Sequence, residues 1–205
     1  MTPARNRVTP TGDIESFALR GAWTGNRGIL HRGEEIVRFH TSDLWITCAL
    51  AFRDRWHEQW RPRHLTWLYF HDEAVSFAAG HRPCAECRRA SYNAYRSAWA
   101  EGLGVPAPSA NAMNRQLHGE RIVRGTHRRR VHERAWNALP DGAFVVVDDA
   151  PFLVLGSHLV EWTREGYGRR RTRPAAETAN VLTPPATLAV LRAGYPVQID
   201  AGAYG

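Results

Sequence analysis

Residues 68–88 combine a strand signal, a helix signal and two cysteines, and they read LYFHDEAVSFAAGHRPCAECR. The apolar residues at the start of this stretch predict a β-strand over 66–70. The acidic residues that follow are typical of a helix start, so a short helix is expected over 71–80, ended by glycine. A longer helix is expected over 84–101, because the proline before it favours the first helical positions.

Two cysteines stand at the predicted start of the longer helix, as Cys84 and Cys87. Two thiolates three positions apart on a first helical turn can chelate one ion, and a helix N-terminus lowers the pKa of a thiol. The alternatives are a thioredoxin-like redox pair, which needs a βαβ context, and two unrelated buried thiols. The chain has 3 cysteines in all, too few for a disulfide framework. The spacing therefore favours a metal site.

Residues 68–88 resemble the second half of the Ada-type metal-binding module, a family that acts in DNA methylphosphotriester repair. The match is carried by Ala79-Gly80, Arg82-Pro83-Cys84, Cys87 and Arg88, after a strand that ends in Phe70 and a short alanine-rich helix. The resemblance implies a Zn²⁺ site on a small β-plus-helix module that contacts DNA. In that family, one cysteine takes a methyl group from a DNA phosphotriester.

The upstream half of the family pattern has two further cysteines spaced C-x-x-x-C. This chain has only Cys48 there, with Leu44 at the position of its partner. Cys48 is therefore the only residue that could inherit the methyl-accepting role. The alternative is a small buried hydrophobe, because the strand predicted over 44–52 has apolar residues at all its even positions, on one face.

The fourth zinc ligand must then be another residue type, and histidine is the usual substitute. The candidates are His31, His40 and His81. His31 leads, because it follows a tight turn and lies on a short strand that could pair beside Cys48. His40 is also interpretable as a loop histidine, and His81 as a side chain that packs over the site. Four protein ligands would make the zinc structural, and a vacant fourth position would make it catalytic.

The formal net charge of +7 favours polyanionic partners, DNA or RNA, and all 27 basic residues are arginine. Arginine's planar fork suits phosphate and base-edge contacts. A solvated loop enriched in arginine by genome composition is the alternative for any single cluster. The residues expected to contact nucleic acid are Arg27, Arg82, Arg88, Arg89, Arg128, Arg129 and Arg130.

The expected fold class is α+β, with a zinc-stapled β-hairpin and helix core, a second small β-meander and a C-terminal helix. The predicted meander has three strands within 144–162, followed by a Gly/Arg/Pro loop over 163–180. The expected domains are an Ada-like module at 13–104, a basic helical or irregular connector at 105–140, and the meander with its C-terminal helix at 141–205, packed on the first module. No run of about 18 apolar residues occurs, so we expect no membrane span and a cytoplasmic location.

Three functions follow as hypotheses. The first is a zinc-containing nucleic-acid-binding protein that binds DNA and acts in DNA repair or the damage response. The second is a metal-dependent enzyme on nucleic acid, a nuclease or a base-processing hydrolase, with His118 and Glu120 as a general acid–base pair. The third is a protein-interaction adaptor whose zinc only staples the fold.

Overall fold

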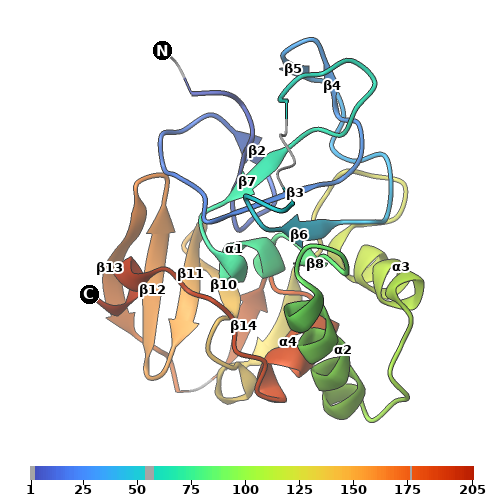
Figure 1. The fold of residues 1–205 in the computed structure, drawn as a ribbon. Helices are drawn as coiled ribbons and strands as arrows, with labels where there is room; N and C mark the ends of the chain where they lie inside the picture. The colour runs from blue at the N-terminus through green and yellow to red at the C-terminus, as the bar shows by residue number, and fades with distance from the viewer. Residues whose placement is uncertain (1–2, 54–57, 176) are drawn as a thin grey trace.

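The computed structural model describes residues 3–53, 58–175 and 177–205 of the chain. Two six-stranded sheets form the framework of the fold, and the helices lie between and beside them (Figure 1). The class is α+β, as the sequence predicted, because the helices and strands do not alternate as they do in a parallel α/β sheet.

The first sheet is made of short strands and carries Cys48. Most of its neighbouring strands are antiparallel, but β1 pairs with β7 and β6 pairs with β8 in parallel. A separate two-stranded hairpin stands beside this sheet, formed by β4 (His31–Arg32) and β5 (Glu35–Ile36). The order of the first sheet is β2 (Ile14–Glu15), β1 (Arg7–Val8), β7 (Leu68–Phe70), β3 (Trp23–Asn26), β6 (Ile46–Cys48) and β8 (Arg82–Pro83).

The second sheet is antiparallel throughout, and the meander predicted within 144–162 forms its centre as β10, β11 and β12. The loop predicted over 163–180 is wrong, because this stretch contains β13 and the greater part of β14. Strand β13 lies at the sheet edge with mostly exposed side chains, so it has no apolar alternation to reveal it. The order is β13 (Gly166–Thr172), β12 (His158–Thr163), β11 (Ala150–Leu155), β10 (Phe144–Val147), β14 (Thr178–Val181) and β9 (His132–Ala135).

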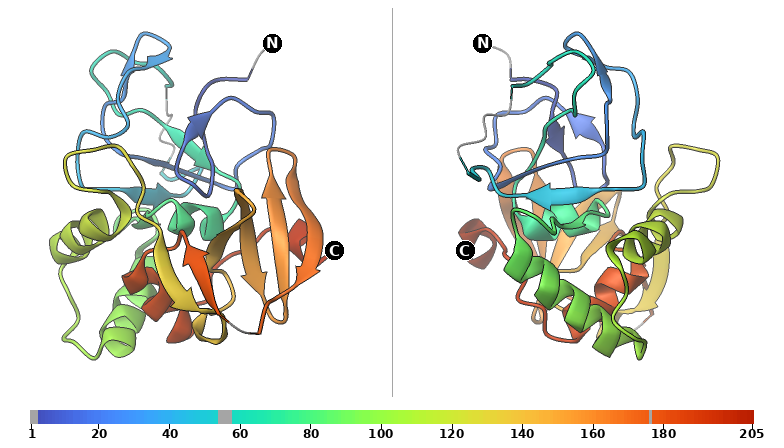
Figure 2. Two further views of the ribbon diagram at one scale, coloured as in Figure 1. Left: turned by 180° about the vertical axis from the view of Figure 1, so that it is seen from behind. Right: turned by 45° about the vertical axis from the view of Figure 1, so that its right-hand side comes forward.

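Helix α1 (Glu73–Ala78) lies between the two sheets and is buried along its whole length (Figures 1 and 2). Its start is fixed by Asp72, whose side chain accepts a hydrogen bond from the Val75 amide at 2.8 Å. Ala74, Val75 and Ala78 pack against the second sheet, whereas Phe77 faces the helices. A helix whose residues are all buried needs such a central position. The short helix predicted over 71–80 is confirmed, over 73–78.

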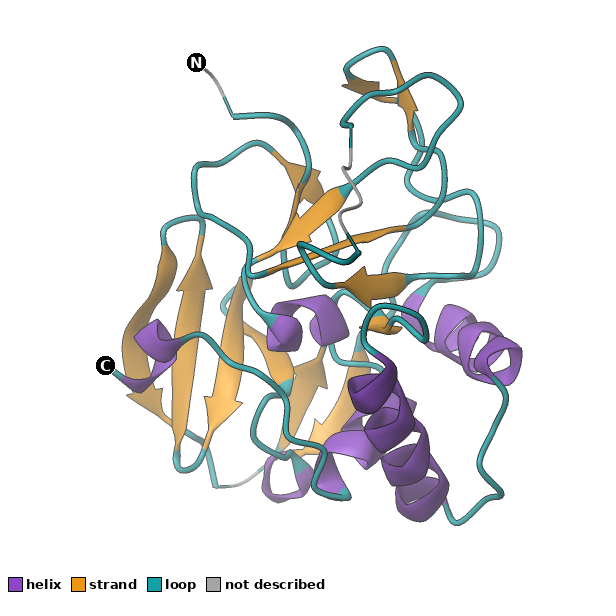
Figure 3. Cartoon of the chain, in the orientation of Figure 1, coloured by secondary structure: helices purple, strands orange, loops and turns teal. Residues whose placement is uncertain are grey.

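The other α-helices gather on one side of the molecule (Figure 3). Helix α2 (Arg89–Leu103) packs against α4 (Pro185–Arg192) in one apolar cluster, and α3 (Ala110–Arg121) adds to it. Two short 3₁₀ helices complete the fold, η1 (Trp136–Ala138) and η2 (Ala201–Tyr204). Among the described residues, no helix is both long enough and apolar enough to cross a lipid bilayer.

The longer helix starts at Arg89 and not at Cys84, so the prediction for its beginning is wrong. Pro83 is the reason, because it pairs with Thr47 as part of β8 and must have an extended backbone. The segment 84–88 forms turns before the helix begins. The two cysteines therefore precede the helix instead of lying on its first turn.

Strand β6 is shorter than the predicted strand over 44–52, and its even-numbered face is not the buried one. Leu44 and Leu50 are 41% and 48% exposed, whereas Trp45 and Thr47 are fully buried. Trp45 is buried because two guanidinium groups pack against its indole ring, which strand alternation alone cannot indicate.

Pairings also cross the expected domain boundaries. Strand β1 precedes residue 13 and pairs with β7, and β9 lies in the expected connector but pairs with β14. The apolar contacts of α1 and α2 with later elements join the expected first and last parts into shared cores.

Candidate metal centre

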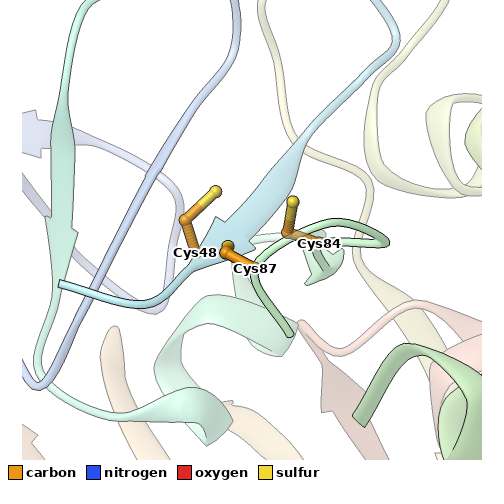
Figure 4. A group of neighbouring side chains, drawn as sticks. All are labelled: Cys48, Cys84 and Cys87. Carbon is orange, nitrogen blue, oxygen red and sulfur yellow. The ribbon is translucent and has the colours of Figure 1, made fainter. Parts of the chain in front are cut away.

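The three cysteines converge at one point (Figure 4). The Sγ atoms of Cys48, Cys84 and Cys87 all lie within 4.8 Å of one another. Cys48 ends β6 and Cys84 directly follows β8. The parallel pairing of these strands sets Thr47 opposite Pro83, and the Cys84 amide donates to the Thr47 carbonyl at 2.9 Å. This register brings residue 48 beside residue 84, and the turn that follows returns Cys87 to the same place.

The sulfur geometry fits a soft or borderline cation. Tetrahedral zinc with Zn–S bonds of about 2.3 Å separates its sulfurs by about 3.8 Å, so only a small adjustment is needed here. All three cysteines are free thiols, and two of them are buried. Three sulfur donors match the preferences of Zn²⁺ far better than those of Mg²⁺ or Ca²⁺.

Cys84 is the thiol of the cluster that loses its proton most readily. The pKa of Cys84 is lowered to about 5, chiefly because the Cys48 thiol donates a hydrogen bond to it and further because backbone N–H groups point at it. One of these is the Glu86 amide, at 3.4 Å from the sulfur. The same hydrogen bond between Cys48 and Cys84 raises the pKa of Cys48, and burial raises the pKa of Cys87. Metal binding would therefore require Cys48 and Cys87, whose pKa values are raised, to lose their protons as well.

The sulfur cluster borders a pocket of about 160 Å³. Its walls are mostly apolar, with one buried amide side chain and one exposed carboxylate side chain. The residues that line it together with the cysteines are Asn26, Ile46, Ala49, Phe52, Leu65, Trp67 and Glu86. A cation bound by the sulfurs would thus lie beside a space large enough for a small molecule.

The prediction of His31 as the fourth ligand is wrong. Its Nδ1 lies 2.6 Å from the Thr66 hydroxyl and its Nε2 lies 3.2 Å from the Arg61 carbonyl. The reason is topological, because β4 pairs with β5 in the separate hairpin, and β3 takes the place beside Cys48. In the described parts of the chain, the metal-ligand group consists of the cysteines alone.

The other two candidates also lie elsewhere. His81 is fully buried against the rings of Phe70 and Trp45, at centroid distances of 4.6 and 5.2 Å. His40 lies 5.1 Å from His118, ring to ring, and is half-buried.

Several arginines expected at a nucleic-acid surface are in the interior. Arg27, Arg82 and Arg88 are 0%, 2% and 7% exposed, so they do not form an open phosphate-binding surface. Arg82 donates to Asn114 at 2.8 Å, and Arg88 donates to the buried carboxylate of Glu73 at 2.5 Å. These guanidinium groups join segments of the fold, which overturns the surface role predicted for them.

The other arginines that were predicted to contact nucleic acid lie nearer to solvent. Arg89, Arg128 and Arg130 are exposed. Arg129 is half-buried and donates to the carbonyls of Ala78 and Leu182, so it links the basic segment to the core.

His118 and Glu120 do not form the predicted acid–base pair. Glu120 accepts hydrogen bonds from Gln116 and from the Ala186 amide, both at 2.9 Å, and so serves the first turn of α4. His118 accepts from Arg121 at 3.2 Å instead. Residues two apart on a helix point to different sides, which explains the separation.

No protein-family model, curated protein or solved structure gives a significant match to this chain. The resemblance of residues 68–88 to the Ada-type module therefore remains a prediction from the residues themselves.

Proposed function

We propose that the protein is a zinc-containing nucleic-acid-binding protein in which Cys48, Cys84 and Cys87 hold Zn²⁺. The observation that carries the metal part is the convergence of three sulfurs, within 4.8 Å, from separate segments of the chain. Free cysteines with only a packing role have no reason to share one point, and a thiolate with two adjacent thiols is a favourable environment for a cation.

The nucleic-acid part rests on the charge and on its distribution. The net charge is +7, and the segment after α3 has three exposed arginines, Arg124, Arg128 and Arg130. Arg53 is also exposed, and its guanidinium carbon lies 4.9 Å from the centroid of Phe52, which lines the pocket beside the cysteines. Exposed guanidinium groups favour phosphate contact because binding releases condensed counterions. The Ada-like residues add support for a role in DNA repair.

The zinc part is tested by elemental analysis of protein purified under reducing conditions. We expect about one zinc per chain, and its loss in Cys84→Ser, because the residue with the thiolate is removed. His31→Asn is the matched control and should keep its zinc, since His31 hydrogen-bonds elsewhere. Metal-free wild-type protein from zinc-supplemented cells, or zinc retained in Cys84→Ser, rejects the proposal.

The nucleic-acid part is tested by fluorescence anisotropy of a labelled DNA or RNA oligonucleotide over a range of salt concentrations. With duplex DNA, Arg124→Gln with Arg128→Gln should reduce the slope of log K against log salt by about 1.8, that is, about 0.9 for each lost phosphate contact. Arg115→Gln with Arg192→Gln removes the same charge from other exposed positions and should change the slope little. Equal effects of both pairs would mean that net charge alone governs binding.

The pocket beside the cysteines favours a second candidate, a metal-dependent enzyme acting on nucleic acid. A metal centre with three protein ligands and an accessible fourth position is typical of catalytic zinc. Turnover of a labelled oligonucleotide by wild-type protein, absent in Cys48→Ser protein that still binds the oligonucleotide, would support this candidate. Binding without turnover by zinc-loaded protein would reject it.

A further inference from the structure

Four basic side chains from distant segments surround His40 and form with it a group of five. We name them the His40 cluster, and they are His40, His118, His127, Arg27 and Arg121. The His40 ring lies 5.1 Å from the ring of His118 and 5.9 Å from that of His127. None of the five lines the pocket beside the cysteines. The cluster is therefore a separate feature that the metal centre does not explain.

Two buried guanidinium groups form the interior side of the His40 cluster. Arg27 and Arg121 are 0% and 1% exposed, and their guanidinium carbons lie 4.2 and 3.9 Å from the centroid of the Trp45 ring. Within the described residues, neither forms an ion pair with a carboxylate. Buried cations without a counterion are costly, and a bound anion would reduce that cost.

Several buried donors in this interior also lack an acceptor. Nη2 of Arg27, Nε of Arg121 and Nδ1 of His81 have no hydrogen-bond partner among the described residues. Nε of Arg27 donates to Nε2 of His81 at 3.3 Å, so the proton of neutral His81 is on the unpartnered Nδ1. Most buried polar groups in folded proteins are paired. The region behind His40 thus has more donors than acceptors.

His118 presents a donor on the outer side of the cluster. Its Nδ1 accepts from Nη2 of Arg121 at 3.2 Å, which leaves the proton of the neutral ring on Nε2. His118 and His40 are half-buried and His127 is exposed. These three rings are the part of the cluster that a solute can reach.

Two carboxylates lie near enough to act on the charges of the His40 cluster. Asp13 acts on Arg27, and Asp43 acts on Arg121 and His118. A hollow of about 430 Å³ adjoins the cluster through Phe39 and His127, and Asp13 also lines it. This hollow gives a solute access to the edge of the cluster.

We propose that the His40 cluster binds a phosphate group, with His40 and His118 donating directly and Arg27 and Arg121 supplying positive charge from behind. A tetrahedral oxyanion suits the site because it accepts from several directions at once. The source is either free phosphate or the backbone of a nucleic acid. This proposal does not rest on the zinc centre.

Isothermal titration calorimetry with inorganic phosphate and with a dithymidine phosphodiester tests the proposal. His118→Gln should weaken phosphate binding about tenfold, the loss of one charge-assisted hydrogen bond. His158→Gln is the matched control, because His158 is exposed on the second sheet, and it should bind as wild type does. Binding of both probes assigns the site to a phosphodiester backbone, and binding of inorganic phosphate alone assigns it to free or terminal phosphate.

A second measurement covers the case in which His118→Gln does not fold. In wild-type protein, phosphate should shift the NMR signals of the His40 and His118 ring C–H groups and leave those of His158 unchanged. The proposal is overturned if neither probe binds at millimolar concentration, or if the shifts are uniform over all histidines. Zinc content and oligonucleotide binding are measured in parallel, so that failure here is distinguishable from failure of the proposed function.

Discussion

The substitution Glu73→Gln probes a buried carboxylate that holds the cysteine-bearing segment in place. Glu73 is 1% exposed and accepts hydrogen bonds from Arg88 at 2.5 Å, from the Tyr195 hydroxyl at 2.9 Å and from the Gln198 amide at 3.1 Å. Arg88 directly follows Cys87, and its guanidinium carbon lies 3.8 Å from the centroid of the Trp23 ring. One carboxylate thus connects α1, the C-terminal segment and the metal-binding turn.

The expected loss follows from the burial of both charges. The side chains of Arg88 and Glu73 are 5% and 1% exposed, so the pair is not screened by water. Removing one partner of such a pair costs about 3–5 kcal/mol, because the other charge stays buried without compensation. For a chain of this size, 1 kcal/mol corresponds to a Tm shift of about 2–4 °C, so the Tm should fall by roughly 6–20 °C.

Thermal unfolding followed by circular dichroism, with and without a zinc chelator, measures this loss. Glu101→Gln is the matched control, since Glu101 is exposed on α2 and should change stability by less than about 0.5 kcal/mol. Adding Arg88→Met to Glu73→Gln should recover part of the loss, because it removes the uncompensated charge. A loss below about 1 kcal/mol for Glu73→Gln would show that the ion pair is not held in a low-dielectric environment.

Three further predictions concern other parts of the fold. Gly25→Ala should lower the free energy of unfolding by roughly 1–3 kcal/mol and weaken zinc binding, because the added Cβ would lie 2.1 Å from the Ile46 carbonyl oxygen and separate β3 from β6. Denaturant unfolding measures the first effect, and a zinc-competition assay measures the second. Burial, followed by repulsion from neighbouring histidines and arginines, lowers the pKa of His40 from 6.5 to about 4. The stability contributed by neutral His40 should therefore be complete above pH 6.5 and decrease as the pH falls towards 4, so urea unfolding of His40→Gln should show a smaller loss over that range. Tyr95→Phe should lower the free energy of denaturant unfolding by about 1–3 kcal/mol, because the fully buried Thr187 hydroxyl loses its hydrogen-bond partner at 2.8 Å. Adding Thr187→Val should recover much of this loss.

The sequence predicts the elements whose signals are local. Helix α1 is recognisable because Asp72 is a good cap and Glu73 follows it, and the strands β10 to β12 have clear apolar runs. The cysteine cluster is also predictable, because the spacing of Cys84 and Cys87 leaves Cys48 as the only other cysteine.

What the sequence does not predict depends on pairing between distant segments. Pro83 is a helix-start signal by itself, yet its pairing with Thr47 keeps it extended and delays α2 to Arg89. His31 could not be excluded as a ligand without knowing that its strand pairs in a different sheet.

The arginines show a second limit. Composition gives their number and charge but not their burial, and Arg27 and Arg88 are as inaccessible as core aliphatic residues. The sequence does not predict the His40 cluster either, because its members come from positions 27, 40, 118, 121 and 127 and share no motif.

The alternation of side chains along β6 makes the metal centre sensitive to strand alignment. Thr47 points towards α1, where its hydroxyl donates to Ser76 at 2.9 Å, and Cys48 points to the opposite face. A slip of one residue would exchange these two side chains and leave the sulfur cluster incomplete. Metal binding would therefore stabilise only the native pairing register of β6. A folding intermediate with a shifted register would not be stabilised by the ion.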